Sequence, residues 1–285
     1  MSKRRNIVFV FLATTFFIFL PHFVFSQIGN GLNEEENYVY DIVEPKTLEI
    51  DADFNFEHYS ANASVNAKKI KLNIQADITY FNAPSITFRY GIIKNLEFQL
   101  ITGYTGVLTK GTATIKTQKN RLISANKDVT GLSALSMGLK AGLLSNKKAR
   151  PSLSFTGIVT LPNIGNPLFA PDNIGTELDL NFYNSLSNHI DITYSFGTIW
   201  SGYKDDTYNS YNYSITPGYS FSDYVGLYLD FNGVIEKNNS SENRFDVDLS
   251  FTFNDYITLD VYGGTSFNTK KFYFLGSTLT TTIPF

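Results

Sequence analysis

The sequence predicts an all-β fold, a transmembrane antiparallel up-and-down β-barrel of about twelve strands. Three observations support this prediction. Apolar and polar residues alternate with a period of two through most of the chain, the connections between these runs are alternately short and long, and aromatic residues gather where the runs end. Aromatic residues make up 15% of the chain, yet its mean hydropathy is only −0.10. This combination favours a wall that spreads aromatic side chains over a lipid-facing surface.

The first runs show the alternation that predicts strands. Over residues 48–57 every second residue is apolar, and the residues between are acidic or polar. Only an extended strand separates two such sets onto opposite faces. A second run keeps one phase from Leu72 to Tyr90, and Pro84 inside it predicts a local defect in one long strand. The other predicted strands are 96–104, 135–143, 153–161, 174–182, 190–200, 211–219, 225–235, 245–253, 257–261 and 273–285.

The connections predict which ends of the strands lie together. Counted back from the C-terminus, every second connection is short and carries Asn or Asp, residues that tolerate turn backbone. These short connections are 92–95, 145–150, 186–189, 221–224 and 253–256. The other set is mostly longer and more polar, at 60–69, 107–130, 162–173, 203–209 and 237–243. Outer-membrane barrels have short periplasmic turns and long outer loops, whereas a soluble β-sandwich, the alternative, does not need this sorting.

Aromatic residues flank both kinds of connection. Beside the short connections lie Tyr90, Tyr219, Phe221, Tyr224, Phe253 and Tyr256, and near the long ones lie Tyr104, Trp200, Tyr203 and Tyr211. Two aromatic belts, one at each membrane interface, explain both groups.

The N-terminal part of the chain predicts export. A basic start, an apolar run and a small residue before Gln27 predict a cleaved signal peptide at residues 1–26. The apolar run covers about 14 residues, which is short of the roughly 20 that a transmembrane helix needs. Residues 47–285 form the predicted barrel. The acidic segment 27–46 is expected to be a loose periplasmic tail, with a small plug entering the barrel as the alternative.

The C-terminal strand carries a second signal for the outer membrane. Alternation places Phe285, Ile283 and Leu279 on one face. A strand of this kind resembles the C-terminal recognition strand of outer-membrane proteins, which ends in an aromatic residue and is read by the barrel-assembly machinery. We therefore expect these three residues to be the assembly signal, and we expect the finished wall to contact outer-membrane lipid and lipopolysaccharide.

Charge and cysteine content limit the partners of the chain. The sequence has 23 basic and 26 acidic residues, and without the three basic residues of the signal peptide the net charge is about −6. Nucleic acid is excluded as a partner because it requires a basic face. The chain has no cysteine, so it can form neither a disulfide nor the lipid-modified cysteine of a lipoprotein.

If apolar residues face lipid, the alternate residues line the lumen. The predicted lumen residues with charge are Glu49, Asp51, Asp53, Glu57, Arg89, Glu97, Lys140, Glu177, Asp179, Asp230, Asp246, Asp248 and Asp260. Acidic residues dominate this set, so we expect any conductance to favour cations. Folding about the turn at 92–95 would place Arg89 opposite Glu97 and Tyr90 opposite Leu96. A cross-strand ion pair between Arg89 and Glu97 is favoured over a substrate clamp.

Several short motifs resemble a known family. Arg89-Tyr90-Gly91, Leu96-Glu97, Gly138-Leu139-Lys140 and Leu161-Pro162 resemble the MetA-type family of outer-membrane barrels, named for a phenol-degradation pathway. The similarity extends over residues 48–285. Members of this family are described as transporters, so the resemblance implies a transport-type barrel.

An enzyme is not expected. Outside the signal peptide only His58 and His189 could serve as catalytic histidines. His189 lies in a short connection and is expected to be a turn residue, whereas His58 has Ser60 close by at a strand end. Outer-membrane phospholipases use a Ser and a His in such a position, but an interfacial His at a strand end is the favoured interpretation. The sequence shows no set of metal ligands and no phosphate-binding glycine motif, so no cofactor is expected.

The sequence leaves two functions open. The favoured one is passive or facilitated passage of small solutes, either cations or small aromatic and hydrophobic compounds. The alternative is a non-conducting structural or adhesive barrel that binds partners through its outer loops, above all 107–130.

Overall fold

The computed structural model describes residues 42–67, 70–116, 121–145, 151–203, 209–236, 241–268 and 272–285. The predicted signal peptide, residues 27–41 of the predicted tail, and parts of the connections at 145–150, 203–209 and 237–243 lie outside these ranges. The described residues include no helix long and apolar enough to cross a membrane. They form β1 (Thr47–Ala67), β2 (Ile70–Ile93), β3 (Leu96–Lys116), β4 (Arg121–Leu132), β5 (Ser136–Leu144), β6 (Ser152–Thr160), β7 (Gly175–Ser185), β8 (Ile190–Trp200), β9 (Asn209–Ser222), β10 (Val225–Glu236), β11 (Glu242–Asn254), β12 (Ile257–Ser266) and β13 (Phe272–Pro284).

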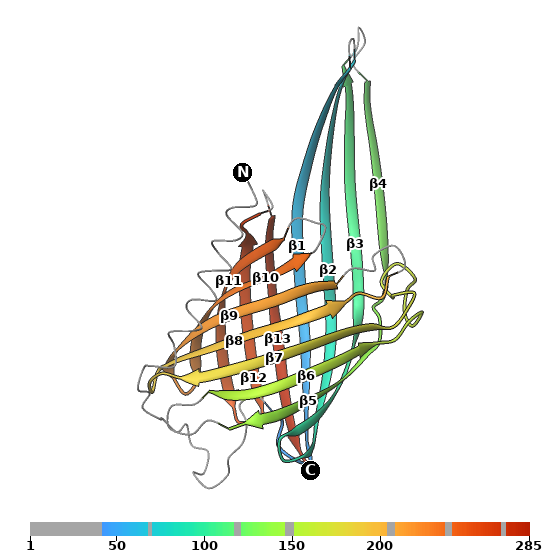
Figure 1. Cartoon of the computed structure of the whole chain (residues 1–285). Helices are drawn as coiled ribbons and strands as arrows, with labels where there is room; N and C mark the ends of the chain where they lie inside the picture. Colours follow the sequence, from blue (N-terminus) through green and yellow to red (C-terminus); the bar gives the residue numbers. More distant parts are fainter. Residues whose placement is uncertain are drawn as a thin grey trace.

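The strands form one closed antiparallel sheet (Figure 1). Each strand from β5 to β13 pairs with the next, β13 pairs with β1, β1 with β2, and β2 with β3. The lower part of β3 pairs with β5, and its upper part pairs with β4. β4 and β5 therefore lie one above the other along the same edge of β3. The wall therefore contains twelve strands, which confirms the predicted barrel and its strand number.

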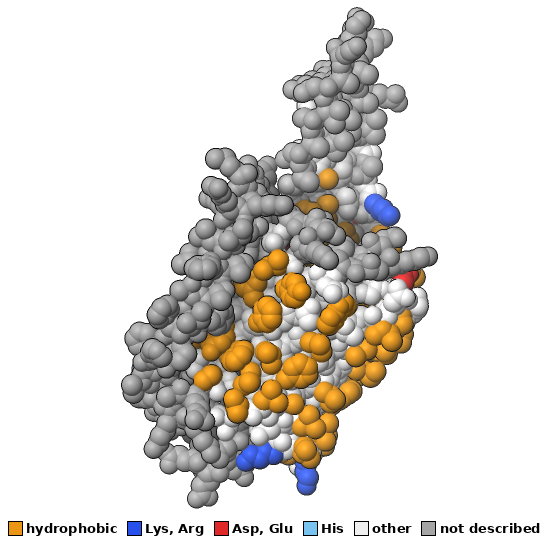
Figure 2. Space-filling view, viewed as in Figure 1, with side chains coloured by type: hydrophobic (Ala, Val, Ile, Leu, Met, Phe, Trp, Pro, Cys, Tyr) orange, Lys and Arg blue, Asp and Glu red, His pale blue; other side chains and the backbone are white. Residues whose placement is uncertain are grey.

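The wall is apolar outside and polar inside. Hydrophobic side chains cover the face of the barrel seen in Figure 2, and the exposed large side chains include Leu178, Leu180, Phe196, Val247, Leu249 and Leu275. The buried side chains are largely polar, among them Glu97, Gln99, Thr105 and Lys140. This arrangement reverses that of a water-soluble domain and suits a barrel whose outer surface meets lipid.

The short-turn end of the barrel is closed by turns whose side chains bond the backbone. In the turn after β11, the Asn254 side-chain oxygen accepts from the Tyr256 amide at 2.8 Å. In the turn after β9, the Ser222 hydroxyl accepts from the Tyr224 amide at 3.2 Å. Such residues keep the connections tight. Two tyrosines beside these turns, Tyr224 and Tyr256, are exposed on the outer surface.

The closing strand β13 carries the residues of the predicted assembly signal. Its residues Ile283 and Leu279 pair with Leu48 and Ala52 of β1 and are exposed on the outer surface. Phe285 follows the strand, has 77% of its surface exposed, and donates its amide to the Lys46 carbonyl at 2.9 Å. The aromatic ring therefore contributes little packing to the folded barrel.

At the opposite end, two predicted loops are strands instead. Residues 60–67 continue β1, and β3 extends through residue 116 before β4 returns at Arg121, so β1 to β4 rise beyond the rest of the wall (Figure 1). The predictions of loops at 60–69 and 107–130 are therefore wrong for the described residues 60–67, 107–116 and 121–130. Alternation of apolar and polar residues is enforced where one face meets lipid, and a sheet that projects past the wall has no such constraint.

Pro84 marks an irregularity inside β2. The strand is continuous, as predicted, but its pairing with β3 shifts between Asn82 and Ser85. Because side chains alternate along a strand, this bulge reverses which residues face the lumen. Tyr80 therefore lies inside the barrel, where the unbroken phase of the sequence predicted an outward side chain.

Candidate functional site

The barrel encloses a cavity of about 710 Å³. Seven of the thirteen predicted lumen residues line it, six carboxylates and one guanidinium: Glu49, Asp51, Asp230, Asp246, Asp248, Asp260 and Arg89. The remaining lining side chains are hydroxyl-bearing, and include Thr216, Tyr228 and Tyr262. A cavity with this lining is strongly acidic.

The other six predicted residues lie outside this lining, and several have specific partners. Asp53 accepts hydrogen bonds from the hydroxyls of Tyr262 at 2.6 Å and Thr278 at 3.0 Å. Glu177 and Asp179 both accept from the Asn212 side-chain amide, at 3.1 and 2.8 Å. Glu57, Glu97 and Lys140 take part in or lie beside the two arginine networks described next.

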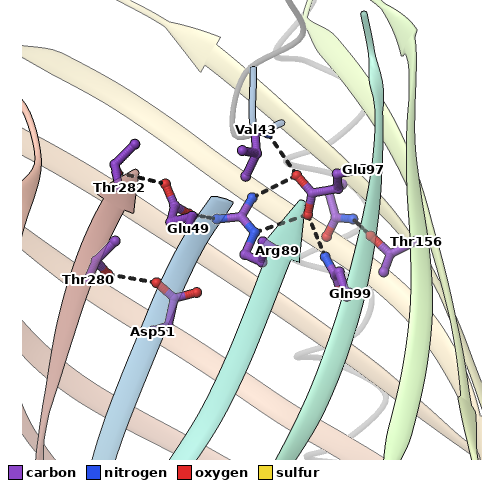
Figure 3. A network of polar contacts seen from close by, with 10 residues as sticks. Val43, Glu49, Asp51, Arg89, Glu97, Gln99, Thr156, Thr280 and Thr282 are labelled. Atoms are coloured by element: carbon purple, nitrogen blue, oxygen red, sulfur yellow. Dashed lines mark hydrogen bonds and ion pairs between the residues drawn. The ribbon is translucent and has the colours of Figure 1, made fainter. Parts of the chain in front are cut away.

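Arg89 joins two strands at the short-turn end of the lumen (Figure 3). Its guanidinium bonds to Glu49 of β1 and makes a two-pronged contact with Glu97 of β3, with Nε–Oε1 at 3.0 Å and Nη2–Oε2 at 3.1 Å. Glu97 has no exposed surface and also accepts from the Gln99 amide at 2.7 Å. Lys140, also buried, is its register partner on β5. A buried carboxylate needs this many partners because its desolvation is costly.

The register at this turn differs from the prediction. Arg89 pairs with Gln99 and Gly91 with Glu97, because β2 continues to Ile93 and leaves only residues 94 and 95 in the turn, and a bulge between Gly91 and Ile93 then offsets this shift by one residue. The predicted pairing of residue 89 with 97 is therefore wrong. The ion pair forms nonetheless, diagonally, since a long guanidinium reaches the next position on the neighbouring strand.

The segment before β1 enters the short-turn end of the barrel. Ile42 and Val43 are buried, and the Val43 amide donates to Glu97 Oε2 at 2.8 Å (Figure 3). A side chain at Gly91 would overlap the carbonyl oxygens of Glu44 and Val43, which explains the glycine of the Arg89-Tyr90-Gly91 motif. In the described part of the predicted tail, residues 42 and 43 thus pack inside the barrel rather than lie loose.

A second cavity, of about 400 Å³, lies toward the long-loop end. Its lining is Tyr80, Asn82, Ser85, Thr105, Val107, Ser133, Leu168, Phe169 and Tyr203. Leu168 and Phe169 belong to the connection between β6 and β7. Asn166 anchors this connection. The Asn166 side-chain amide donates to the Thr130 carbonyl at 3.1 Å, and the Asn166 side-chain oxygen accepts from the Leu168 amide at 3.0 Å. The Tyr203 hydroxyl donates to the Phe169 carbonyl at 3.0 Å, so Tyr203 lines this cavity and not an outer aromatic belt.

A second arginine network was not predicted from the sequence. Arg244 donates to Glu57 through both terminal nitrogens, at 2.8 and 3.2 Å, and to Glu242 through Nε at 2.9 Å. Its guanidinium carbon lies 4.9 Å from the ring centre of Phe272, in cation–π contact. Arg244 shares its strand face with Asp246, and this parity could have indicated its position in the lumen. Its partner Glu57 lies far away in the sequence and becomes a neighbour only on closure.

His58 and Ser60 do not form a catalytic pair. The His58 ring nitrogen Nδ1 lies 3.2 Å from the Thr79 hydroxyl, and the His58 ring packs against Tyr273 with centroids 5.0 Å apart. Ser60 donates instead to the Asp77 carboxylate. Over the described ranges, no group of three or more acidic or histidine side chains is arranged to hold a metal ion.

The closed twelve-stranded wall, apolar outside and polar inside, defines a transmembrane β-barrel of the outer-membrane type. The chain belongs to the family described as "Putative MetA-pathway of phenol degradation", whose sequence profile matches residues 51–282. This confirms the resemblance found from the sequence motifs.

One solved structure shows the same fold. An outer membrane channel of the COG4313 family from Pseudomonas putida F1 is 13% identical, with 90% of this chain and 100% of that chain covered and a TM-score of 0.53. The Ralstonia pickettii toluene transporter TbuX is 5% identical, with 85% of this chain and 89% of that chain covered and a TM-score of 0.42. No curated protein matches the chain by sequence.

Proposed function

We propose that this chain is an outer-membrane channel for small solutes and that it passes cations in preference to anions. The observation that carries the proposal is the 710 Å³ cavity, whose lining holds six carboxylates and one guanidinium inside a closed wall. A lining of one sign within a low-dielectric wall concentrates counter-ions of the other sign. Arg89 adds little opposing charge because it is already bonded to Glu49 and Glu97.

The proposed orientation follows from the two ends of the barrel. The short-turn end would face the periplasm, with segment 27–46 and the C-terminus on that side, and the extended strands β1 to β4 would face the exterior. Outer-membrane lipid and lipopolysaccharide would contact the apolar wall. The barrel-assembly machinery would read Phe285, Ile283 and Leu279. Replacing Phe285 with Ser should lower the amount of folded barrel in cells and leave refolding in detergent unchanged.

The second cavity favours small aromatic or hydrophobic solutes at the outer mouth. Its lining combines the rings of Tyr80, Phe169 and Tyr203 with the aliphatic Val107 and Leu168. Such a mixture of apolar surface and a few polar groups is typical of sites for small organic ligands. Saturation-transfer NMR with benzyl alcohol should show contact that Phe169→Ala reduces. Phe221→Ala, a change on the exposed outer surface, should leave it intact.

Ion selectivity in planar bilayers tests the main proposal. With a tenfold KCl gradient across refolded protein, we expect a reversal potential of the sign that indicates potassium preference. Replacing both Asp246 and Asp248 with Asn should move it toward zero, because the acidic lining is the source of selectivity. Anion preference in the unmodified protein would refute the cation proposal.

The alternative is a non-conducting barrel that binds partners through its exterior. The feature that favours it is the four-stranded extension of β1 to β4, which projects beyond the wall and offers a large surface (Figure 1). Protein that inserts and folds but remains silent over all voltages and salts would favour this function over passage.

A further inference from the structure

Four carboxylates lie close together on the lumen face of β10, β11 and β12, and we refer to Asp230, Asp246, Asp248 and Asp260 as the lumen acid cluster. Asp230 and Asp246 are direct register partners on β10 and β11. One row further along, Asp248 lies between Tyr228 on β10 and Tyr262 on β12. All four acids and both tyrosines line the 710 Å³ cavity. Directly opposed like charges destabilise a sheet unless something compensates them.

The basic side chains near the cluster are bonded elsewhere. Arg244 lies two residues from Asp246 on the same strand face, yet its guanidinium donates to Glu57 and Glu242. Arg89, across the cavity, is bonded to Glu49 and Glu97. Neutral donors serve two members: Asp230 accepts from Thr216 at 2.7 Å and from the Asn232 amide at 2.6 Å, and Asp260 accepts from the Ser250 hydroxyl.

Two oxygen atoms of the cluster lack a donor altogether. Asp246 has only 8% of its surface exposed, and its Oδ1 is buried without a hydrogen-bond partner. The buried Oδ1 of Asp248 also has none. Leaving a buried charged acceptor unsatisfied costs more than an ordinary hydrogen bond contributes, so these positions favour a cationic donor from a ligand.

The two tyrosine rings indicate what kind of cation fits. The ring of Tyr262 covers Gly276 and that of Tyr228 covers Gly218, since a side chain at either glycine would overlap the ring. The rings therefore lie against the wall on either side of Asp248 and line the cavity. Aromatic faces beside carboxylates are typical of sites for organic ammonium groups, which gain cation–π attraction as well as charge-assisted hydrogen bonds.

From this arrangement we propose that the lumen acid cluster and its two tyrosines bind a small organic ammonium ion. The ammonium group would donate to the carboxylates of Asp246 and Asp248 beside the rings of Tyr228 and Tyr262, and its alkyl substituent would extend into the cavity. The cavity volume of about 710 Å³ accommodates such an ion together with water. The site deepens the proposed cation passage and rests on it for its biological meaning.

Calorimetric titration of refolded protein in a neutral detergent at pH 7.5 tests the site directly. The probe is butylammonium chloride, with 1-butanol as its uncharged counterpart and calcium chloride as a metal-ion comparison. We expect saturable butylammonium binding, no butanol binding, and no competition by calcium. D246N/D248N should weaken binding by about tenfold or more through loss of both charge-assisted hydrogen bonds. Y228L should weaken it about two- to fivefold through loss of one ring.

The matched control is D223N/D255N, which removes the same charge from two exposed turns at the short-turn end. This variant should bind butylammonium like the unmodified protein, and the heat-dependent gel mobility of all variants should report an intact barrel. The proposal is overturned if the two double variants weaken binding equally, if calcium displaces the amine, or if the unmodified protein binds no butylammonium. A silent bilayer with intact binding would refute passage alone, and conductance without binding would refute the site alone.

Discussion

Acidic side chains line both the short-turn end of the lumen and the wall formed by β10 to β12, but their surroundings differ. At the short-turn end, Glu49 and Glu97 share the guanidinium of Arg89, and Glu97 also receives the amides of Gln99 and Val43. In the lumen acid cluster, two buried carboxylate oxygens have no donor. Acidic residues that are bonded to a base therefore stabilise the barrel, whereas acidic residues without a bonded base remain available to a ligand.

Removing Arg89 should have the largest effect on stability, because it leaves the acids at the short-turn end without a base, as in the lumen acid cluster. Arg89→Ala leaves Glu97 buried beside Glu49 without a shared base, and we expect a loss of about 3–5 kcal/mol in the free energy of unfolding. Denaturant unfolding of refolded protein measures it. Lys127→Ala, which removes an equal charge from an exposed position on β4, should change stability little. Similar losses from both variants would show that the network contributes nothing specific.

A smaller effect is expected from the segment before β1. Val43→Pro removes the amide that donates to Glu97 Oε2 while keeping an apolar residue, and a hydrogen bond to a charged group contributes about 1.5–3 kcal/mol. We expect a stability loss in that range and faster hydrogen exchange at the backbone of residues 42–47. Unchanged exchange in the variant would mean that Glu97 does not hold this segment.

The smallest change in stability is expected in the lumen acid cluster, and there it should be an increase. Asp246→Asn keeps the side-chain volume and removes one of two directly opposed charges, so stability should rise by about 0.5–1 kcal/mol at low salt. Glu97→Gln, the equivalent change in the first region, should lower stability. If both substitutions change stability in the same direction, the two groups of acids do not differ in the way we infer.

The sequence predicts the wall well, because lipid imposes a strict rule on it. An outward residue such as Leu178 or Leu249 must be apolar and its neighbours along the strand polar, so alternation reveals both the strands and their faces. The extension of β1 to β4 escapes this rule and was expected to be loops. Pro84 was recognised as a defect, but the reversal of faces that accompanies it depends on the pairing of β2 with β3 and is not visible in one strand.

Parts of the candidate site depend on contacts between distant residues. The Arg89–Glu97 pair follows from one short turn and could be predicted, although that turn is shorter than expected and its register differs. Arg244 and Glu57 meet only because β13 lies between β12 and β1, and the inward position of Tyr203 depends on the connection that carries Phe169. The alternation along a strand specifies which face a residue lies on, whereas the residue's partner on another strand depends on how the strands close into a barrel.

The seam between the first and last strands has a consequence for how the molecule is made. β13 pairs with β1 from Thr47 opposite Pro284 to Tyr59 opposite Phe272. The first strand and the last strand to be synthesised therefore complete the ring. Contacts this remote in the chain carry a high entropic cost until every intervening strand is in place. A nascent chain lacking its final strand would expose two unpaired edges and an apolar exterior, and would aggregate. Closure of the cylinder must therefore wait for the final strand, which makes it a late step in the formation of the barrel.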